Sequence, residues 1–160
     1  MGVIEASGVL AIATRMQRLG EQMRKDGALI YKAHGIDFEP KWFPVIYTLS
    51  LKPLLSVVEL AAEIGYTHPS TIGLLNDLEK QKIIKSSKDK TDERKRLLQL
   101  TDKGKALIEQ MKPVWIIMIE ASNSLINTQN NLMKAIAEVE KQMEIQSFYL
   151  RAKSIMATTQ

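Results

Sequence analysis

Apolar residues recur at helical spacing along most of the chain. Residues 4–33 carry apolar side chains every three or four positions, which predicts a long helix. Residues 40–51 predict a short apolar helix that Pro44 disturbs. Residues 102–126 and 130–156 predict two more long helices, separated by the polar stretch NTQNN.

Two short helices joined by a tight turn are expected between the long ones. Ser56 and Glu59 form a capping-box pattern, in which each side chain can bind the other residue's free amide, and Gly65 ends the helix that they open. Thr67 is placed to cap a second helix over residues 68–81. The leucines of this helix fall on one stripe, so the opposite face is expected to look outward. That face carries Ser70, Gly73, Asn76 and Asp77.

The basic charge of the chain is concentrated in residues 82–105, KIIKSSKDKTDERKRLLQLTDKGK. This segment holds nine Lys/Arg and four Asp/Glu, a net charge of +5, whereas the whole chain carries +4. Two strands, over 83–86 and 96–100, are expected to flank a charged turn, and Thr101 can cap the helix that follows. A local excess of positive charge indicates a polyanionic partner.

Composition argues against an enzyme and against a membrane protein. The chain has no cysteine, no Gly-rich phosphate loop and two histidines, neither of which has a catalytic triad or metal-ligand spacing around it. We therefore expect no metal and no cofactor. The apolar stretch VWIIMI is far shorter than the ~20 residues that span a bilayer, and the N-terminal residues lack a signal-peptide pattern. A cytoplasmic protein is expected.

A helix pair followed by a charged two-stranded ribbon describes a winged helix-turn-helix in a mainly α (α+β) fold. The major groove of DNA, about 12 Å wide, admits one helix, and the first helix of the pair fixes the angle of the second. The ribbon, or wing, extends beyond the compact body, where Lys and Arg can reach phosphates or the minor groove.

Residues 56–107 resemble the MarR family of bacterial transcriptional regulators. The similarity lies in LSVVELAAEIGYTHPSTIGLLNDLEKQKII and KDKTDERKRLLQLTDKGKAL, and most specifically in Asp92 and Arg94, which match the Asp-x-Arg pattern of the family's wing. The resemblance implies a homodimer that binds a pseudo-palindromic operator in double-stranded DNA and responds to a small molecule. It also implies a single chain with dimerisation helices over 1–38 and 102–160 around a DNA-binding lobe over 39–101.

We expect helix 68–81 in the major groove and the wing, residues 86–96, on phosphates or in the minor groove. The candidate DNA contacts are His68, Ser70, Thr71, Ile72, Asn76, Lys88, Lys90, Asp92, Arg94, Lys95 and Arg96. Base reading falls to the helix, with Ile72 placed against a thymine methyl. Two alternatives remain open: Arg94 pairs with Asp92 to shape the wing, and the lysines form a solvated hairpin tip.

Three positions depart from the family pattern. Gly73 stands where a basic residue is usual, Asp77 is acidic on the outward face, and Glu93 precedes Arg94. These departures motivate an alternative function, a winged-helix module that binds a protein or a ligand and has weak or no operator binding.

Aromatic residues cluster before the helix pair and recur in the following long helix. In MarR-like proteins effector pockets lie where the dimerisation helices meet the DNA-binding lobe, so an aromatic or hydrophobic effector is expected here. The pocket candidates are Tyr31, His34, Trp42, Phe43, Tyr47, Trp115 and Met118. Ordinary core packing is the alternative.

Overall fold

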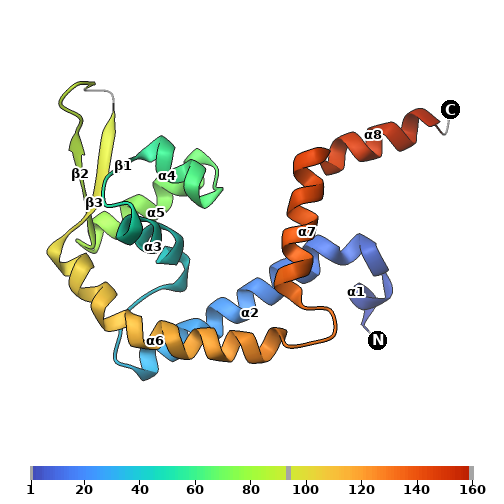
Figure 1. Cartoon of the computed structure of the whole chain (residues 1–160), viewed down its shortest axis with the longest axis horizontal. Coiled ribbons are helices and arrows are strands. Elements are labelled where there is room, and N and C mark those ends of the chain that lie inside the picture. The colour runs from blue at the N-terminus through green and yellow to red at the C-terminus, as the bar shows by residue number, and fades with distance from the viewer. Residues whose placement is uncertain (1, 93–94, 159–160) are drawn as a thin grey trace. The chain divides into compact units, whose positions relative to one another are not determined.

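Helices dominate the computed structural model, which describes residues 2–92 and 95–158 (Figure 1). The chain divides into two compact units, Met1–Ile116 and Ile117–Gln160. The first contains α1 (Val3–Ala6), η1 (Gly8–Ala11), α2 (Ile12–Ala33), η2 (Pro40–Trp42), α3 (Phe43–Leu51), β1 (Leu55–Ser56), α4 (Val57–Ile64), α5 (His68–Lys80), β2 (Ile84–Lys88), β3 (Arg96–Leu100) and the start of α6 (Asp102–Ile126). The second contains the end of α6, α7 (Leu132–Ile145) and α8 (Phe148–Thr158).

The three strands form an antiparallel sheet in the order β1-β3-β2. In the β2–β3 ribbon, Ile84 pairs with Leu100 and Lys88 with Arg96. Strand β3 begins and ends as predicted, and β2 lies one to two residues later than expected. Strand β1, which pairs Leu55 with Leu98, was not predicted. The mainly helical winged helix-turn-helix fold is confirmed.

The expected continuous helix over 4–33 is wrong. The chain breaks at Ser7, whose hydroxyl donates to the Ile4 carbonyl at 2.8 Å, and at Gly8, whose φ of +59° lies in the left-handed region. A residue without Cβ adopts this conformation at little cost, so the chain can turn there before α2 begins.

The expected helix over 130–156 is also wrong, because the chain forms α7 and α8 instead. Gln146 has extended backbone angles (φ −155°, ψ 121°), which end α7. Ser147 then accepts a hydrogen bond from the Leu150 amide at 3.3 Å, so its side chain caps the first turn of α8. The helical spacing of apolar residues continues through this break, so the only local sign of it in the sequence is the capping residue Ser147.

Pro44 lies in the first turn of α3. Pro40 opens η2, and the α-helical segment begins at Phe43, so the missing amide of Pro44 falls in a first turn that needs no amide donor. The expected helix over 40–51 is thus divided into η2 and α3 just before Pro44, which agrees with the predicted disturbance near this residue.

The helix pair forms as its capping residues predict. The Ser56 amide donates to the Glu59 carboxylate at 2.7 Å, and the Glu59 amide donates to the Ser56 hydroxyl at 3.3 Å. Hydrogen bonding of its carboxylate by the Ser56 side chain and the Ser56 amide holds the pKa of Glu59 below its usual range. Gly65 ends α4, and Thr67 Oγ1 accepts from the Ser70 amide at 3.4 Å at the start of α5. Both ends of the connecting turn are thus fixed locally.

The core of the first unit lies between α3, α4, α5 and the sheet. Its fully buried side chains include Val45, Ile46, Leu49, Leu60, Leu75, Leu78 and Leu98. Leu75 and Leu78 have no exposed surface, which fixes the rotation of α5 about its own axis and leaves the opposite face outward.

The sequence LTDKG joins the wing to α6. Thr101 Oγ1 donates to the Ile83 carbonyl, at 3.0 Å, and accepts from the Gly104 amide, also at 3.0 Å. A Cβ on Gly104 would lie 2.2 Å from the Ile83 carbonyl oxygen, which real contacts do not allow. Thr101 and Gly104 therefore permit the close approach that ties the base of the wing to the first turn of α6.

Candidate nucleic-acid interface

The outward face of α5 is polar and exposed. His68, Ser70, Gly73 and Asn76 are all solvent-exposed on this face. In the first turn of α5, Pro69 has no amide hydrogen, the Ser70 amide donates to Thr67 Oγ1, and the Thr71 amide donates to the Thr67 carbonyl. This helix therefore presents polar side chains to solvent more than free backbone amides.

Two predicted contacts on α5, Thr71 and Ile72, are less exposed than the others. Thr71 is completely buried, and its hydroxyl donates to the Thr67 carbonyl at 3.0 Å, so the prediction that it contacts DNA is wrong. The residue falls on the core stripe with Leu75 and Leu78, which explains its burial. Ile72 is half-buried at the edge of the outward face.

The wing projects beyond the helices of the first unit (Figure 1). Beyond Ile84, every residue of β2 is exposed, which places Lys85 and Lys88 in solvent. Lys90 and Lys95, in the turn between the strands, are exposed as well. The described part of the β2–β3 ribbon thus presents four ammonium groups to solvent.

Asp89 shapes the turn of the wing, a role that the sequence reading missed. Its carboxylate accepts from the Thr91 amide at 2.7 Å and from the Asp92 amide at 3.1 Å. The Thr91 hydroxyl also donates to it, and these hydrogen bonds hold the pKa of Asp89 below its usual range. An Asp followed two residues later by Thr is a recognisable turn signal.

Arg96 lies at the base of the wing and pairs with Glu79 of α5. Its guanidinium donates a hydrogen bond to the Glu79 carboxylate, and the two side chains are 37% and 26% exposed. Burial raises the pKa of Glu79, but the hydrogen bonds from Arg96 and Ser86 outweigh it and lower that pKa below the usual value of about 4.5. Arg96 therefore connects the wing to α5, in addition to any contact with DNA.

Asp77, the acidic residue of the outward face, is paired. Lys41 Nζ lies 2.9 Å from Asp77 Oδ2 and 3.0 Å from Glu39 Oε2. The hydrogen bond from Lys41 holds the pKa of Asp77 below its usual range. Lys41 and Asp77 are 36 residues apart in the sequence, and no local pattern connects them.

Arg94 and Asp92 are the residues that were predicted to pair within the wing. Arg94, together with Glu93, lies outside the described residues, so neither its predicted DNA contact nor its predicted pairing is described. Asp92 is half-buried, and its carbonyl accepts from the Lys95 amide at 2.9 Å.

Five of the seven pocket candidates form one aromatic cluster with Phe38. Tyr31, Phe38 and Trp42 pack edge to face, with ring centroids 4.9 and 5.7 Å apart, and all three are buried. Phe43, Tyr47 and Trp115 form a second group, with centroids 5.1 to 5.7 Å apart. Trp115 Nε1 donates to the Tyr31 hydroxyl at 2.9 Å and joins the groups.

The two groups differ in exposure. Burial raises the pKa of Tyr31, which is 1% exposed, whereas Phe43 and Tyr47 are 38% and 42% exposed. Of the remaining candidates, His34 Nδ1 lies 2.9 Å from the Ile30 carbonyl of its own helix, and Met118 belongs to the second unit.

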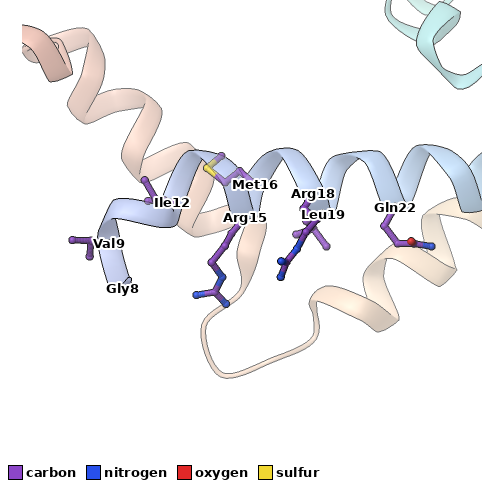
Figure 2. A pocket seen from close by; sticks show the side chains of 8 residues that line it. All are labelled: Gly8, Val9, Ile12, Arg15, Met16, Arg18, Leu19 and Gln22. Carbon is purple, nitrogen blue, oxygen red and sulfur yellow. The ribbon is translucent and has the colours of Figure 1, made fainter. Parts of the chain in front are cut away.

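Two hollows are lined by residues of the first unit. One, of about 290 Å³, lies between Trp42, the turn at Gly35–Asp37 and the first turns of α6. The other, of about 900 Å³, is lined by Gly8, Val9, Ile12, Arg15, Met16, Arg18, Leu19 and Gln22. Figure 2 shows that these eight residues come from η1 and the first half of α2, so this hollow follows one exposed helix face. Neither hollow contains the exposed aromatic group.

The class of the protein follows from α4, α5 and the β2–β3 ribbon, which together are a winged helix-turn-helix. Residues 34–95 match the model of the MarR family. This segment, which is less than half of the chain, contains α3, α4, α5 and β2, and over it the chain is similar to the MarR family. No curated protein matches the sequence. None of the helices within residues 2–92 and 95–158 combines the length and apolar character of a membrane span.

Solved structures share this fold over most of the chain. The regulator MosR of M. tuberculosis, in complex with DNA, has a TM-score of 0.71 and 19% identity, covering 84% of this chain and 96% of its own. The repressor CouR, bound to a 23-mer DNA duplex, has a TM-score of 0.69 and 22% identity, covering 88% and 98%. The regulator PcaV of Streptomyces coelicolor, in complex with its natural ligand, has a TM-score of 0.64 and 15% identity, covering 92% and 99%.

Proposed function

We propose that the chain is a homodimeric, cytoplasmic regulator that binds a pseudo-palindromic operator through a lobe over residues 39–101. Helix α5 enters the major groove and the wing lies on phosphates or in the adjacent minor groove. The observation that carries this proposal is the position of four exposed lysines on a projecting ribbon beside the outward polar face of α5. Two similar structures, those of MosR and CouR, are complexes with DNA, which supports the same use here.

The contact set follows from exposure. His68, Ser70 and Asn76 read base edges, with Ile72 at the edge of the helix face. Lys88, Lys90 and Lys95 contact phosphates, and they are joined by Lys85, which the sequence reading left out. Arg94 and Asp92 stay in the set on the strength of the family pattern, and Arg96 supports the wing from α5.

A second copy of the chain is proposed to cover the apolar surfaces outside this lobe. Val9, Leu10, Ile12 and Met16 are between 56% and 88% exposed on η1 and α2, which is unusual for a face with no partner. The second unit exposes large apolar side chains as well, namely Met133, Val139, Met143, Phe148, Tyr149 and Met156. These exposures support dimerisation through residues 1–38 and 102–160.

An aromatic or hydrophobic effector is proposed to bind at the exposed group Phe43, Tyr47 and Trp115. These rings offer apolar faces and a hydroxyl at the surface, and Trp115 reaches the buried group through Tyr31. PcaV, described with its natural ligand, supports an effector in proteins of this fold. Such a ligand would change DNA binding by favouring one spacing of the two lobes of the dimer.

Selection of bound sites from random duplex DNA tests the proposed function. The expected result is enrichment of two half-sites about one helical turn, ~34 Å, apart. Failure of the protein to retain any duplex at low ionic strength would favour the alternative, a winged-helix interaction module without operator binding.

A further inference from the structure

Lys41 is placed to control the charge of the DNA-facing surface from outside the helix-turn-helix. It lies in η2, before α3, and its ammonium reaches across to Asp77 on the outward face of α5 at 2.9 Å. The same ammonium lies 3.0 Å from Glu39 and 6.0 Å from the ring centroid of the buried Trp42. Three contacts therefore hold one flexible side chain beside α5.

Asp77 needs such a partner if α5 enters a groove. The side chain of Asp77 is 48% exposed. Asp77 follows Gly73 by four residues, so the two residues lie on the same outward face of α5. A carboxylate that approaches the phosphates of a groove is repelled unless a cation accompanies it. Among the described residues of α5, Lys80 also contributes positive potential at Asp77, but the hydrogen bond comes from Lys41.

We propose that Lys41 is a positioning residue for DNA binding, which neutralises Asp77 and directs its carboxylate away from the phosphates. The inference rests on the proposed function, because it requires α5 to meet DNA. In solution an exposed pair of this kind adds little to stability. The pair affects DNA binding instead, because the Asp77 carboxylate then lies close to phosphates.

A double-mutant cycle in duplex affinity tests the proposal. Lys41→Met should weaken binding of a selected duplex by roughly three- to tenfold, because one negative charge is unmasked beside phosphates. Asp77→Asn should bind as well as or better than the wild type. The variant with both substitutions should bind within about twofold of Asp77→Asn.

The ion pair Lys52–Glu63 provides a matched control, since it joins the segment after α3 to α4 and has similar exposure, 51% and 41%. Lys52→Met, with and without Glu63→Gln, should show no such rescue. Thermal unfolding of each variant separates a folding defect from a change in affinity.

Two results overturn the inference while the proposed function stands. In the first, Lys41→Met weakens binding by the same factor in the wild type and in Asp77→Asn, which would make Lys41 a direct phosphate contact. In the second, Lys41→Met leaves the affinity for the duplex unchanged. A wild-type protein that binds no duplex overturns the proposed function itself, and this inference with it.

Discussion

Arg96 and Glu79 join the wing to α5 through a hydrogen-bonded ion pair. Arg96 begins β3, and Glu79 lies in the last turn of α5, so the pair restrains the angle between the wing and this helix. Because the side chains are partly shielded from water, the pair restrains that angle more than a fully exposed pair could.

This pair predicts a pH-dependent contribution to stability. The folded-state pKa of Glu79 is lower than its usual value of about 4.5, so the contribution is present above that value and is lost as pH falls through the folded pKa. We expect the wild type to exceed Glu79→Gln in unfolding free energy by about 0.5–1 kcal/mol at pH 7, less toward pH 3. Urea unfolding across this range measures it, and a pH-independent difference contradicts it.

The open space around Gly73 predicts that a basic side chain at this position raises the affinity for DNA. A Cβ at this position would meet nothing within 4 Å, so a larger side chain fits without rearrangement. Gly73→Arg should strengthen duplex binding about threefold or more by adding positive charge to the outward face. Gly73→Ala is the control: it should raise unfolding free energy by ~0.5–1 kcal/mol and leave affinity unchanged. Weaker binding by both variants would show that the backbone of α5 approaches DNA closely here.

The close approach at Gly104 predicts that the base of the wing does not tolerate a side chain at this position. Gly104→Ala places a methyl group 2.2 Å from the Ile83 carbonyl oxygen and should lower unfolding free energy by about 1–3 kcal/mol. Gly20→Ala is matched to it, since its Cβ would meet only Arg24, at 3.6 Å, and should be neutral or stabilising. Thermal unfolding compares the two, and equal effects would contradict the close approach.

The position of Trp115 predicts that its fluorescence, and not that of Trp42, changes when an effector binds. Trp115 contacts the exposed rings Phe43 and Tyr47, whereas Trp42 is buried. Titration with 4-hydroxybenzoate and with tetraphenylphosphonium should therefore change the emission of Trp42→Phe, which keeps Trp115. Trp115→Phe should respond little. The reverse pattern, or no response from the wild type, contradicts the proposed effector site.

Local signals predicted the helix pair well. The caps at Ser56 and Thr67 and the leucine stripe of α5 depend on residues within a few positions of each other, so the sequence displays them directly. The same reasoning explains the error at Thr71, because a short polar residue on a core stripe can satisfy its hydroxyl within the helix and be buried.

Contacts between distant segments could not be predicted. Lys41–Asp77 and Arg96–Glu79 join residues 36 and 17 positions apart, and each depends on how η2 and β3 pack against α5. The helix breaks at Gly8 and Gln146 were missed because apolar periodicity continues across them. The aromatic cluster was expected near the correct residues, but its division into a buried and an exposed group required tertiary packing.

The salt dependence of duplex binding tests the central claim most directly. For the wild type, the logarithm of the association constant should fall steeply with the logarithm of salt concentration. Replacing Lys88, Lys90 and Lys95 with Gln should reduce that slope by about 2–3, close to one for each lost phosphate contact. Replacing Lys25, Lys32 and Lys141, which removes the same charge elsewhere, should leave the slope nearly unchanged. Equal slopes for the wing variant and the wild type would contradict the account.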